Sequence, residues 1–479
     1  MIYPSFCGPS YASQSPIADA ELCLNWYPEQ MESPGASSRQ VLYPRPGLQA
    51  FVTSPTGSRV RQLYSNIFSN VERCFAVVSN AIKEIAADMT ITDRGVVAED
   101  ANVASMISNG DGGGQLFANS GREGYCLNLT TNVLTNPVHA VTMAGMVDGY
   151  IVALDATTAT LKISNLLDAN TWDPTQFAQR SAQPDPWRAL VVNYNEIWLL
   201  GSQTSEVWYD AGSFPFPFAL RPGAIMQQGI AATFSAAVLD GTVIWLAHNQ
   251  NGQNQVVAAS GYVPTRISNH AMEWQISRYP RVDDATAWVY EDQGHPFYVL
   301  NFPTAGATWV YDKSTQQWHQ RDTWIAETNT STAWHPQCHT FAFGKHLVGD
   351  RNAPTIYQMD VSFGLDVDGR AIRRVRRAPM LVKEEDRLFL GRFRLQMEVG
   401  LGTQAGQGSD PQVLLRWSKD GAQTWGNYRT RSAGRIGQFS TLVDWERNGM
   451  ARQPVAEITV SDPIPWRVVN AFINVEAQQ

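Results

Sequence analysis

The sequence predicts an all-β protein with a β-propeller-like body and a separate C-terminal antiparallel β-sandwich-type domain. Three observations support this fold class. The chain contains 16 Trp, 16 Tyr and 19 Phe residues, and aromatic side chains suit half-buried pleated surfaces. Its 36 Gly and 26 Pro residues supply many turns. Short apolar runs, each bounded by polar turn residues, recur from residue 51 to residue 360.

Residues 1–50 are predicted to form an extended N-terminal arm. Two aromatic segments that contain proline stand out within it, NWYPE at residues 25–29 and YPRPGL at residues 43–48. Proline fixes its own φ and pushes the preceding residue toward an extended conformation. No helical periodicity separates the two segments. We therefore expect the arm to lie across another surface and to become ordered by packing there.

Residues 51–360 are predicted to form the propeller-like domain. Its strand groups share one pattern, in which a polar turn such as 147–149 leads into a very apolar strand such as 149–154, and a later strand carries Trp or Tyr near Asp. The groups recur at intervals of very roughly 45 residues, which is the spacing of four-stranded propeller blades. Radial repetition also hides sheet edges. There is no WD or kelch signature, and an array of β-sandwiches is the main structural alternative.

Residues 361–479 are predicted to form the C-terminal β domain, which we interpret as a platform for contacts with partners. A turn signal at residues 366–369 is followed by an arginine-rich run at residues 370–377. Residues 392–399 then alternate strictly between polar and apolar side chains, and residues 455–460 alternate likewise. This alternation is typical of strands with one buried face, so we expect an antiparallel sandwich or meander.

Charge and cysteine content exclude several classes of protein. The net charge of −8 argues against a generic nucleic-acid binder, which would carry a basic excess. The five cysteines are widely spread and form no C-x-x-C pair, so neither a zinc ribbon nor a disulfide framework is indicated. We expect folding in a reducing cytosol. The first residues lack a signal-peptide pattern, and no window of eighteen apolar residues predicts a membrane span.

Residues 418–425 (SKDGAQTW) nearly match the Asp-box pattern S-x-D-x-G-x-T-W, with Ala422 in place of glycine. In such a turn, Asp and Ser side chains accept hydrogen bonds from backbone amides and the Trp covers the hairpin. Asp-boxes are structural turns that lie away from active sites. A sialidase would need several copies of the box and a Tyr/Glu/Arg catalytic set, and the sequence offers no such set with suitable spacing.

His335, Cys338, His339 and His346 form the one cluster that resembles a set of metal ligands. Pro336 disturbs the strand register that would align them, and no carboxylate pattern completes a site. We interpret them as ordinary strand residues. No Ser/His/Asp set has the context of a nucleophile either. The sequence therefore predicts no catalytic, cofactor-binding or metal-binding residues, no cofactor and no enzyme activity.

The arginine run provides the candidate functional residues, which are predicted to form a partner interface: Arg370, Arg373, Arg374, Arg376 and Arg377. Strand alternation would place Arg374 and Arg376 on one face and Arg373 and Arg377 on the other. Arginines spaced this closely are suited to an ionic contact with an acidic protein or with DNA phosphate. The alternative is a solvated edge strand, because positive charge protects sheet edges from further pairing.

An ordered set of motifs along the chain resembles the packaged-DNA-stabilisation proteins, also called tail hub or nozzle proteins, of short-tailed bacteriophages. The set comprises residues 24–29, 42–51, 60–61, 261–268, 294–303, 308–312, 318–321, 416–425 and 445–449. None of these motifs is catalytic in the family, so the resemblance supplies no active-site residues.

The resemblance implies a structural virion protein that forms a ring below the portal and its adaptor, closes the channel to retain packaged DNA, and guides the genome out during ejection. The partners expected from it are other copies of the chain, in a ring expected to be a hexamer, the portal adaptor or head-to-tail connector, tail fibres or tailspikes, a tail needle or plug, and double-stranded DNA in transient passage. The expected location is the virion tail, after assembly in the host cytoplasm.

Two other functions remain open from the sequence. One is a tail-fibre or receptor-binding adaptor, which the sequence does not separate from a tail hub. The other is a propeller-type protein that binds or hydrolyses glycans. Two carboxylates about 5–9 Å apart in a pocket would favour the hydrolase.

Overall fold

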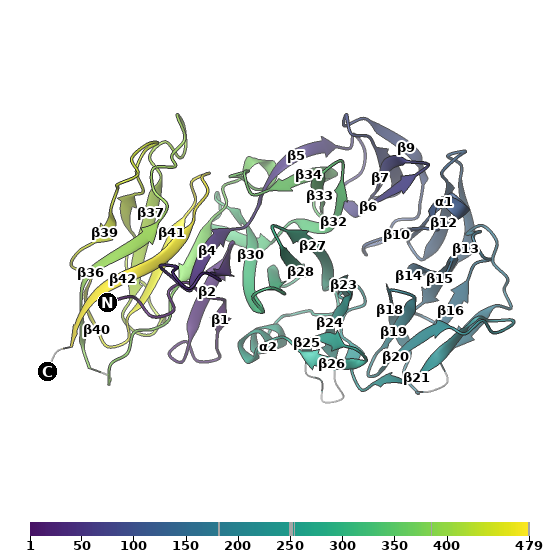
Figure 1. The fold of residues 1–479 in the computed structure, drawn as a ribbon, viewed down its shortest axis with the longest axis horizontal. Helices are drawn as coiled ribbons and strands as arrows, with labels where there is room; N and C mark the ends of the chain where they lie inside the picture. The colour runs from purple at the N-terminus through teal and green to yellow at the C-terminus, as the bar shows by residue number, and fades with distance from the viewer. Residues whose placement is uncertain (181–182, 249–251, 253, 385, 478–479) are drawn as a thin grey trace.

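The computed structural model describes residues 1–180, 183–248, 252, 254–384 and 386–477. It confirms the predicted fold class, because strands dominate and the helices of the described residues are short: α1 (Gly110–Gly113), α2 (His270–Ser277) and the 3-10 turn η1 (Val367–Gly369). The molecule is elongated, with a propeller at one end and a sandwich at the other (Figure 1).

The first four blades of the propeller are antiparallel sheets of four strands each, built from consecutive segments of the chain. Their strands are β6 (Val60–Phe68), β7 (Val71–Val78), β8 (Ala81–Ile85) and β9 (Ile91–Val96); β10 (Ser105–Ser108), β11 (Gln115–Ser120), β12 (Glu123–Asn128) and β13 (Leu134–His139); β14 (Met143–Val147), β15 (Tyr150–Asp155), β16 (Thr160–Ile163) and β17 (Phe177–Gln179); and β18 (Trp187–Asn193), β19 (Glu196–Gly201), β20 (Ser205–Asp210) and β21 (Phe218–Met226).

The fifth and sixth blades depart from this simple pattern. In the fifth, the innermost position is shared by two short strands, and α2 follows the outermost strand. The sixth carries an additional short strand, β31, on its outer strand β30. The strands are β22 (Gly229–Ile230), β23 (Ala237–Leu239), β24 (Thr242–His248), β25 (Asn254–Ser260) and β26 (Val263–Arg266); and β27 (Thr286–Asp292), β28 (His295–Phe302), β29 (Ala307–Asp312), β30 (Gln317–Ile325) and β31 (Thr330–Ala333).

The seventh blade joins the two ends of the propeller. Its three inner strands are β32 (Pro336–Ala342), β33 (Lys345–Asp350) and β34 (Thr355–Asp360). Its outer strand is β5 (Gly47–Thr53), which comes from the N-terminal part of the chain and pairs antiparallel with β34. The innermost strands of neighbouring blades contact one another around the whole circle, and β32 meets β6. The described residues therefore form a closed seven-bladed propeller and not an array of sandwiches.

The core of the propeller lies between the blades. A separate cluster of buried apolar side chains fills each space between two neighbouring blades, including the space between the seventh blade and the first. In that last cluster Phe51 of β5 packs with Val60 of β6 and Ile356 of β34. Burial of apolar surface favours each of these contacts by roughly 25 cal/mol per Å², so closure of the ring stabilises every blade.

The first 46 residues lie mainly in the sandwich. They supply β1 (Tyr11–Ala12), β2 (Ala20–Leu24), β3 (Trp26–Gln30) and β4 (Gln40–Pro44). The segment is extended, as expected from its prolines, and its packing partner is its own chain. It contributes strands to both sheets of the sandwich before β5 enters the propeller.

The sandwich consists of two antiparallel layers that share a core of large aromatic residues. One layer has the order β2, β35, β41, β37, β38, and the other has the order β3, β4, β42, β36, β39, with β40 also paired to β36. Trp26, Phe393, Trp445 and Trp466 are fully buried between them. The strands that follow residue 361 are β35 (Arg374–Arg377), β36 (Leu388–Met397), β37 (Gln412–Ser418), β38 (Arg429–Ser432), β39 (Val443–Trp445), β40 (Gly449–Ala451), β41 (Val455–Val460) and β42 (Val468–Ala477).

One sheet runs without interruption from the propeller into the sandwich. Strand β2 pairs in parallel with β30 of the sixth blade and antiparallel with β35 of the sandwich. Leu24 is the residue that pairs with both Gln320 and Val375. In Figure 1 the purple N-terminal strands lie between the green propeller blade and the yellow-green sandwich. The N-terminal segment thus joins the two domains.

Candidate functional site

The two proline-containing segments meet at the junction of the domains. Asn25, between β2 and β3, is buried and has a φ of +58°. Its side-chain oxygen accepts hydrogen bonds from Arg45 Nε at 2.9 Å and from the backbone N–H of Asp322 at 3.1 Å. Its amide nitrogen donates to Asp322 Oδ1 at 2.5 Å and to the carbonyl of Arg373 at 2.7 Å. One small side chain therefore links the N-terminal segment, the sixth blade and the start of the sandwich.

A desolvated ion pair lies beside Asn25. Arg45 Nη2 is 2.5 Å from Asp366 Oδ2, and the two side chains are 0% and 1% exposed. Arg45 also donates to the carbonyl of Pro46 at 2.9 Å and lies over the ring of Trp334 at 5.0 Å. Burial lowers the pKa of Arg45, and the Asp366 carboxylate opposes that shift. A buried charge needs such partners, because loss of one partner leaves the other uncompensated.

A histidine between two carboxylates forms a second contact across the junction. His295 Nδ1 lies 2.8 Å from Asp312 Oδ2 within the sixth blade, and His295 Nε2 lies 2.5 Å from Glu29 Oε2 on β3. The hydrogen bond to Asp312 is the main cause that raises the pKa of His295, and Glu29 acts in the same direction. Since both ring nitrogens face carboxylates, only the imidazolium can donate to both. The arrangement fastens β3 to the propeller.

The structure corrects the predicted role of two arginines of the run. Arg374 and Arg376 are 1% and 0% exposed, so neither is available to a partner, and β35 is an interior strand with β2 and β41 on its two sides. The solvated-edge alternative is therefore wrong as well. Arg376 donates to the carbonyls of Phe6 and Pro9 and pairs with Glu21. Burial lowers the pKa of Arg374 to about 9.

The other three arginines of the run are partly exposed and already have acceptors within the chain. Arg370 lies 3.3 Å from Glu327, and Arg377 lies 2.9 Å from Glu457. Arg373 donates to Ser331 Oγ at 3.0 Å. The acidic groups that we expected on a partner are thus supplied largely by the same polypeptide. A contact of Arg370, Arg373 and Arg377 with another protein stays a prediction.

The Asp-box has the structural role predicted from its turn chemistry. Asp420 accepts hydrogen bonds from the backbone N–H groups of Thr424 at 2.8 Å and Gln423 at 3.1 Å, and Ser418 Oγ accepts from Ala422 N at 2.8 Å. The Thr424 hydroxyl is the main cause that lowers the pKa of Asp420 to about 2. The following residue, Trp425, packs against two arginines of the sandwich.

The structure gives the members of the histidine cluster different surroundings. His339 Nε2 is 3.0 Å from His346 Nδ1 and their rings stack, whereas Cys338 lies buried in the core between the seventh and first blades. Burial lowers the pKa of His339 to about 3 and raises that of Cys338 to about 12. Within the described part of the chain, no group of three or more His, Cys, Asp or Glu residues is placed to hold a metal ion.

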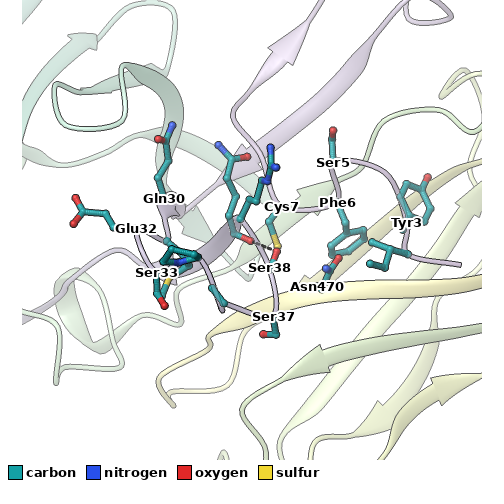
Figure 2. Close-up of a pocket in the computed structure, with 16 residues that line it drawn as sticks. Tyr3, Ser5, Phe6, Cys7, Gln30, Glu32, Ser33, Ser37, Ser38 and Asn470 are labelled. Atoms are coloured by element: carbon teal, nitrogen blue, oxygen red, sulfur yellow. Dashed lines mark hydrogen bonds between the residues drawn. The ribbon is translucent and has the colours of Figure 1, made fainter.

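A hollow of about 940 Å³ lies between residues 2–7 and the loop that joins β3 to β4. Figure 2 shows Tyr3 and Phe6 toward one side of it and Glu32 and Ser33 toward the other, with Cys7 and Ser38 between them. Glu32 is its one carboxylate. Cys7 donates to the carbonyl of Val469 at 3.5 Å, and burial raises its pKa to about 12. The lining of the hollow therefore contains no pair of carboxylates.

Sequence reasoning missed the junction as a site. Its residues come from segments some 300 positions apart, as the separation of 297 between Asn25 and Asp322 illustrates. One signal was present in the sequence, namely an arginine between two prolines in an apolar context at residues 44–46. A buried arginine is costly without a dedicated partner, so this pattern indicates a specific buried contact.

Two family models match the chain. The one described as "Bacteriophage P22 Gp10, beta-propeller" covers residues 19–364, and the one described as "Bacteriophage P22 Gp10, beta-sandwich" covers residues 373–476. The chain belongs to this phage family. The resemblance noted in the sequence is confirmed, and the family is one of phage structural proteins that stabilise packaged DNA.

Solved structures resemble the fold at low sequence identity. Virginiamycin B lyase from Staphylococcus aureus is 10% identical with a TM-score of 0.43, covering 65% of this chain and 98% of its own. The N-terminal domain of Nup159 is 10% identical with a TM-score of 0.44, covering 71% and 98%. We draw no functional argument from similarity at this level. The search of curated proteins gave no significant match. Among the described residues, no helix has the length and apolar character needed to cross a bilayer.

Proposed function

We propose that this phage structural protein forms the tail hub, or nozzle, of a short-tailed phage. In this role copies of the chain form a ring below the portal adaptor, close the channel to retain packaged DNA, and guide the genome during ejection. The observation that carries the proposal is the match of both domains, in the same order and over nearly the whole chain, to a family named for stabilisation of packaged DNA.

The way in which the two domains are joined suits a subunit that must resist mechanical force. The continuous sheet through β2, the buried Arg45–Asp366 pair and the Glu29–His295 contact all cross the junction. Interfaces with so many desolvated contacts resist relative motion of domains. A ring subunit that holds DNA under pressure needs this rigidity.

The charge of the chain suits passage of DNA. Each phosphate that a protein neutralises adds a salt-dependent contribution to binding, which would oppose sliding. With a net charge of −8 the chain favours release of the duplex over its retention on the surface.

The proposed partners are other copies of the chain in a hexameric ring, the portal adaptor, tail fibres or tailspikes, and a tail needle or plug. The proposed location is the virion tail, after assembly in the host cytoplasm. We also propose that the protein acts without enzymatic activity. Each of five surface hollows is lined by a single carboxylate, namely Glu32, Asp173, Asp283, Asp420 or Asp19, whereas glycosidases need a pair.

The mass of the assembled species tests this function. The purified chain is mixed with the portal adaptor of the same phage and examined by native mass spectrometry and electron microscopy. We expect a ring coaxial with the adaptor, and we expect particles assembled without this chain to lose their DNA. A chain that stays monomeric, does not bind the adaptor and hydrolyses a glycan would contradict the proposal.

A further inference from the structure

A cationic hollow with an apolar border lies at one end of the sandwich, away from the junction. The hollow has a volume of about 620 Å³ and is lined by the side chains of Arg387, Lys419 and Arg452, with Met450 at its border. Phe389 lies beside Met450, because the two residues pair across β36 and β40. We call these five residues the basic–apolar surface.

Three segments hold this surface in place. Leu388 on β36 pairs with Ala451 on β40, which brings Arg387 and Arg452 to the same end of the sheet. Asp420 of the Asp-box turn forms a bridge with Gln453, and Gly421 N donates to the carbonyl of Gln453 at 3.0 Å. The turn therefore carries Lys419 to the hollow on a backbone fixed by its own hydrogen bonds. The surface is preorganised, which reduces the entropy lost when a partner binds.

The three cations form no ion pair with the described residues of the chain, unlike most arginines of the sandwich. The side chains of Arg387, Lys419 and Arg452 are all exposed. Asp420 is the one carboxylate that lines the hollow, and it is committed to the amides and hydroxyl of its own turn. The three cations are therefore available to attract an acidic group of a partner, because no ion pair within the described chain neutralises them.

The apolar border indicates that the partner is a protein. Phe389 is 49% exposed and Met450 is 38% exposed. Aromatic residues, Met and Arg are the residue types enriched at protein interfaces. A surface for the DNA backbone would instead extend the cations along a stripe.

The same chain offers the complementary charge. The sandwich, residues 1–46 and 361–479, contains 19 Lys and Arg against 17 Asp and Glu, whereas the propeller, residues 47–360, contains 17 Lys and Arg against 27 Asp and Glu. A ring requires that one patch of each subunit meets a different patch of the next. Opposite net charges on the two parts of one chain supply such a pair.

We propose that the basic–apolar surface binds the propeller of the neighbouring copy of the chain, whose residues 47–360 carry a net negative charge. This inference rests on the proposed ring and names one of the two patches that close it. The cations set the orientation of the approaching subunit, and Phe389 and Met450 are buried when the contact forms.

The test is a charge reversal with a matched control. The double variant R387E/R452E removes two of the three cations. The control R435E/R447E makes the same charge change at two other exposed arginines of the sandwich, which form no ion pair with the described residues. Sedimentation and native mass spectrometry of the full-length proteins give the assembly midpoint at low and at high salt. We expect R387E/R452E to raise the midpoint concentration at least about tenfold, and the control to match the wild type.

The outcomes separate this inference from the proposed function. If the wild type forms rings and R387E/R452E forms them equally well, the surface is not an interface, while the tail-hub function stands. If the wild type stays monomeric at all concentrations, alone and with the portal adaptor, both ideas fail. Thermal unfolding establishes that each variant is folded. Should R387E/R452E not fold, R387Q/R452Q must shift the midpoint in the same direction, and an unchanged midpoint overturns the proposal.

Discussion

Single buried polar residues decide how the two domains are joined. Asn25 satisfies its whole side chain with groups from three parts of the chain, and Arg45 does nearly the same with Asp366, Pro46 and Trp334. Hydrogen bonds to charged, desolvated groups are worth more than those at the surface. Each of these hydrogen bonds contributes a modest net free energy to folding, whereas removal of one partner leaves the other buried without compensation and costs much more. Substitutions at the junction should therefore change the free energy of unfolding measurably.

Asp366→Asn should destabilise the protein strongly. The substitution keeps the shape of the side chain and leaves the Arg45 guanidinium buried without its counter-charge, so we expect a loss of about 3–5 kcal/mol in the free energy of unfolding. Urea denaturation at neutral pH measures it. Glu327→Gln is the control, because it removes the partner of Arg370 where Glu327 is 74% exposed, and it should change stability by less than about 0.5 kcal/mol. A small effect of D366N would contradict the importance of the buried pair.

His295 should make the junction sensitive to alkaline pH. Asp312 and Glu29 raise its folded-state pKa above the ordinary value of 6.5. A group whose pKa rises on folding contributes stability that is fully present below its unfolded pKa and is lost as the pH rises through the folded pKa. The uncharged rings of Tyr27 and Phe297 also contact His295 and add no competing charge in this range.

His295→Gln should therefore lower the free energy of unfolding more at about pH 6 than at about pH 9. Chemical denaturation of wild type and variant across this range gives the difference at each pH. His270→Gln serves as the control, since the His270 side chain is 83% exposed. A difference between wild type and H295Q that stays constant with pH would show that His295 acts by shape alone.

Among the elements, β5 closes the propeller, because it pairs with β34 and packs between the seventh and first blades. It completes the seventh blade, and its first residue, Gly47, approaches a neighbouring backbone closely. A Cβ on Gly47 would lie 2.2 Å from the carbonyl oxygen of Phe363 and 2.7 Å from that of Leu365. Both atoms belong to the main chain and cannot move aside without shifting the start of the sandwich.

Gly47→Ala should thus destabilise the closed propeller by about 1–3 kcal/mol, the usual range for overpacking. Calorimetry should show a melting temperature several degrees below that of the wild type. Gly35→Ala is the matched control, because nothing lies within 4 Å of its added Cβ. Equal melting temperatures for G47A and G35A would mean that β5 adjusts its position freely.

The elements also show how far the sequence could be interpreted. Alternation and turn chemistry predicted the all-β fold class and the Asp-box turn correctly, since these depend on residues close together in the chain. The closure by β5, the burial of Arg374 and Arg376, and the pairing of His295 with Glu29 depend on contacts between distant segments. A charge run looks the same whether its partners are on another protein or, as for Arg376, on residues 5–21 of the same chain.

For the whole molecule, we expect a single unfolding transition. Residues 361–479 alone lack β2, β3 and β4, which are members of both layers of the sandwich. Two layers without these strands expose part of the core that contains Trp26, so the isolated fragment should not fold. Circular dichroism and calorimetry of the fragment measure this.

Co-expression with residues 1–46 as a separate chain should restore a soluble, folded sandwich, because those residues supply the missing strands. A fragment of residues 361–479 that melts cooperatively by itself would contradict this expectation and would also allow two transitions in the full-length protein.

The closing strand of the propeller has a consequence for synthesis of the chain. Thr53 of β5 and its partner Thr355 of β34 are 302 residues apart. At roughly 5–20 residues per second on the ribosome, β5 waits about 15–60 s before its partner exists. During that wait an extended apolar segment is a template for pairing with other nascent chains. Pro44 and Pro46, which have no amide hydrogen to donate, and Arg45 between them act as gatekeepers against such pairing. The residues that hold the two domains together in the folded protein thus also limit pairing of the incomplete chain during synthesis.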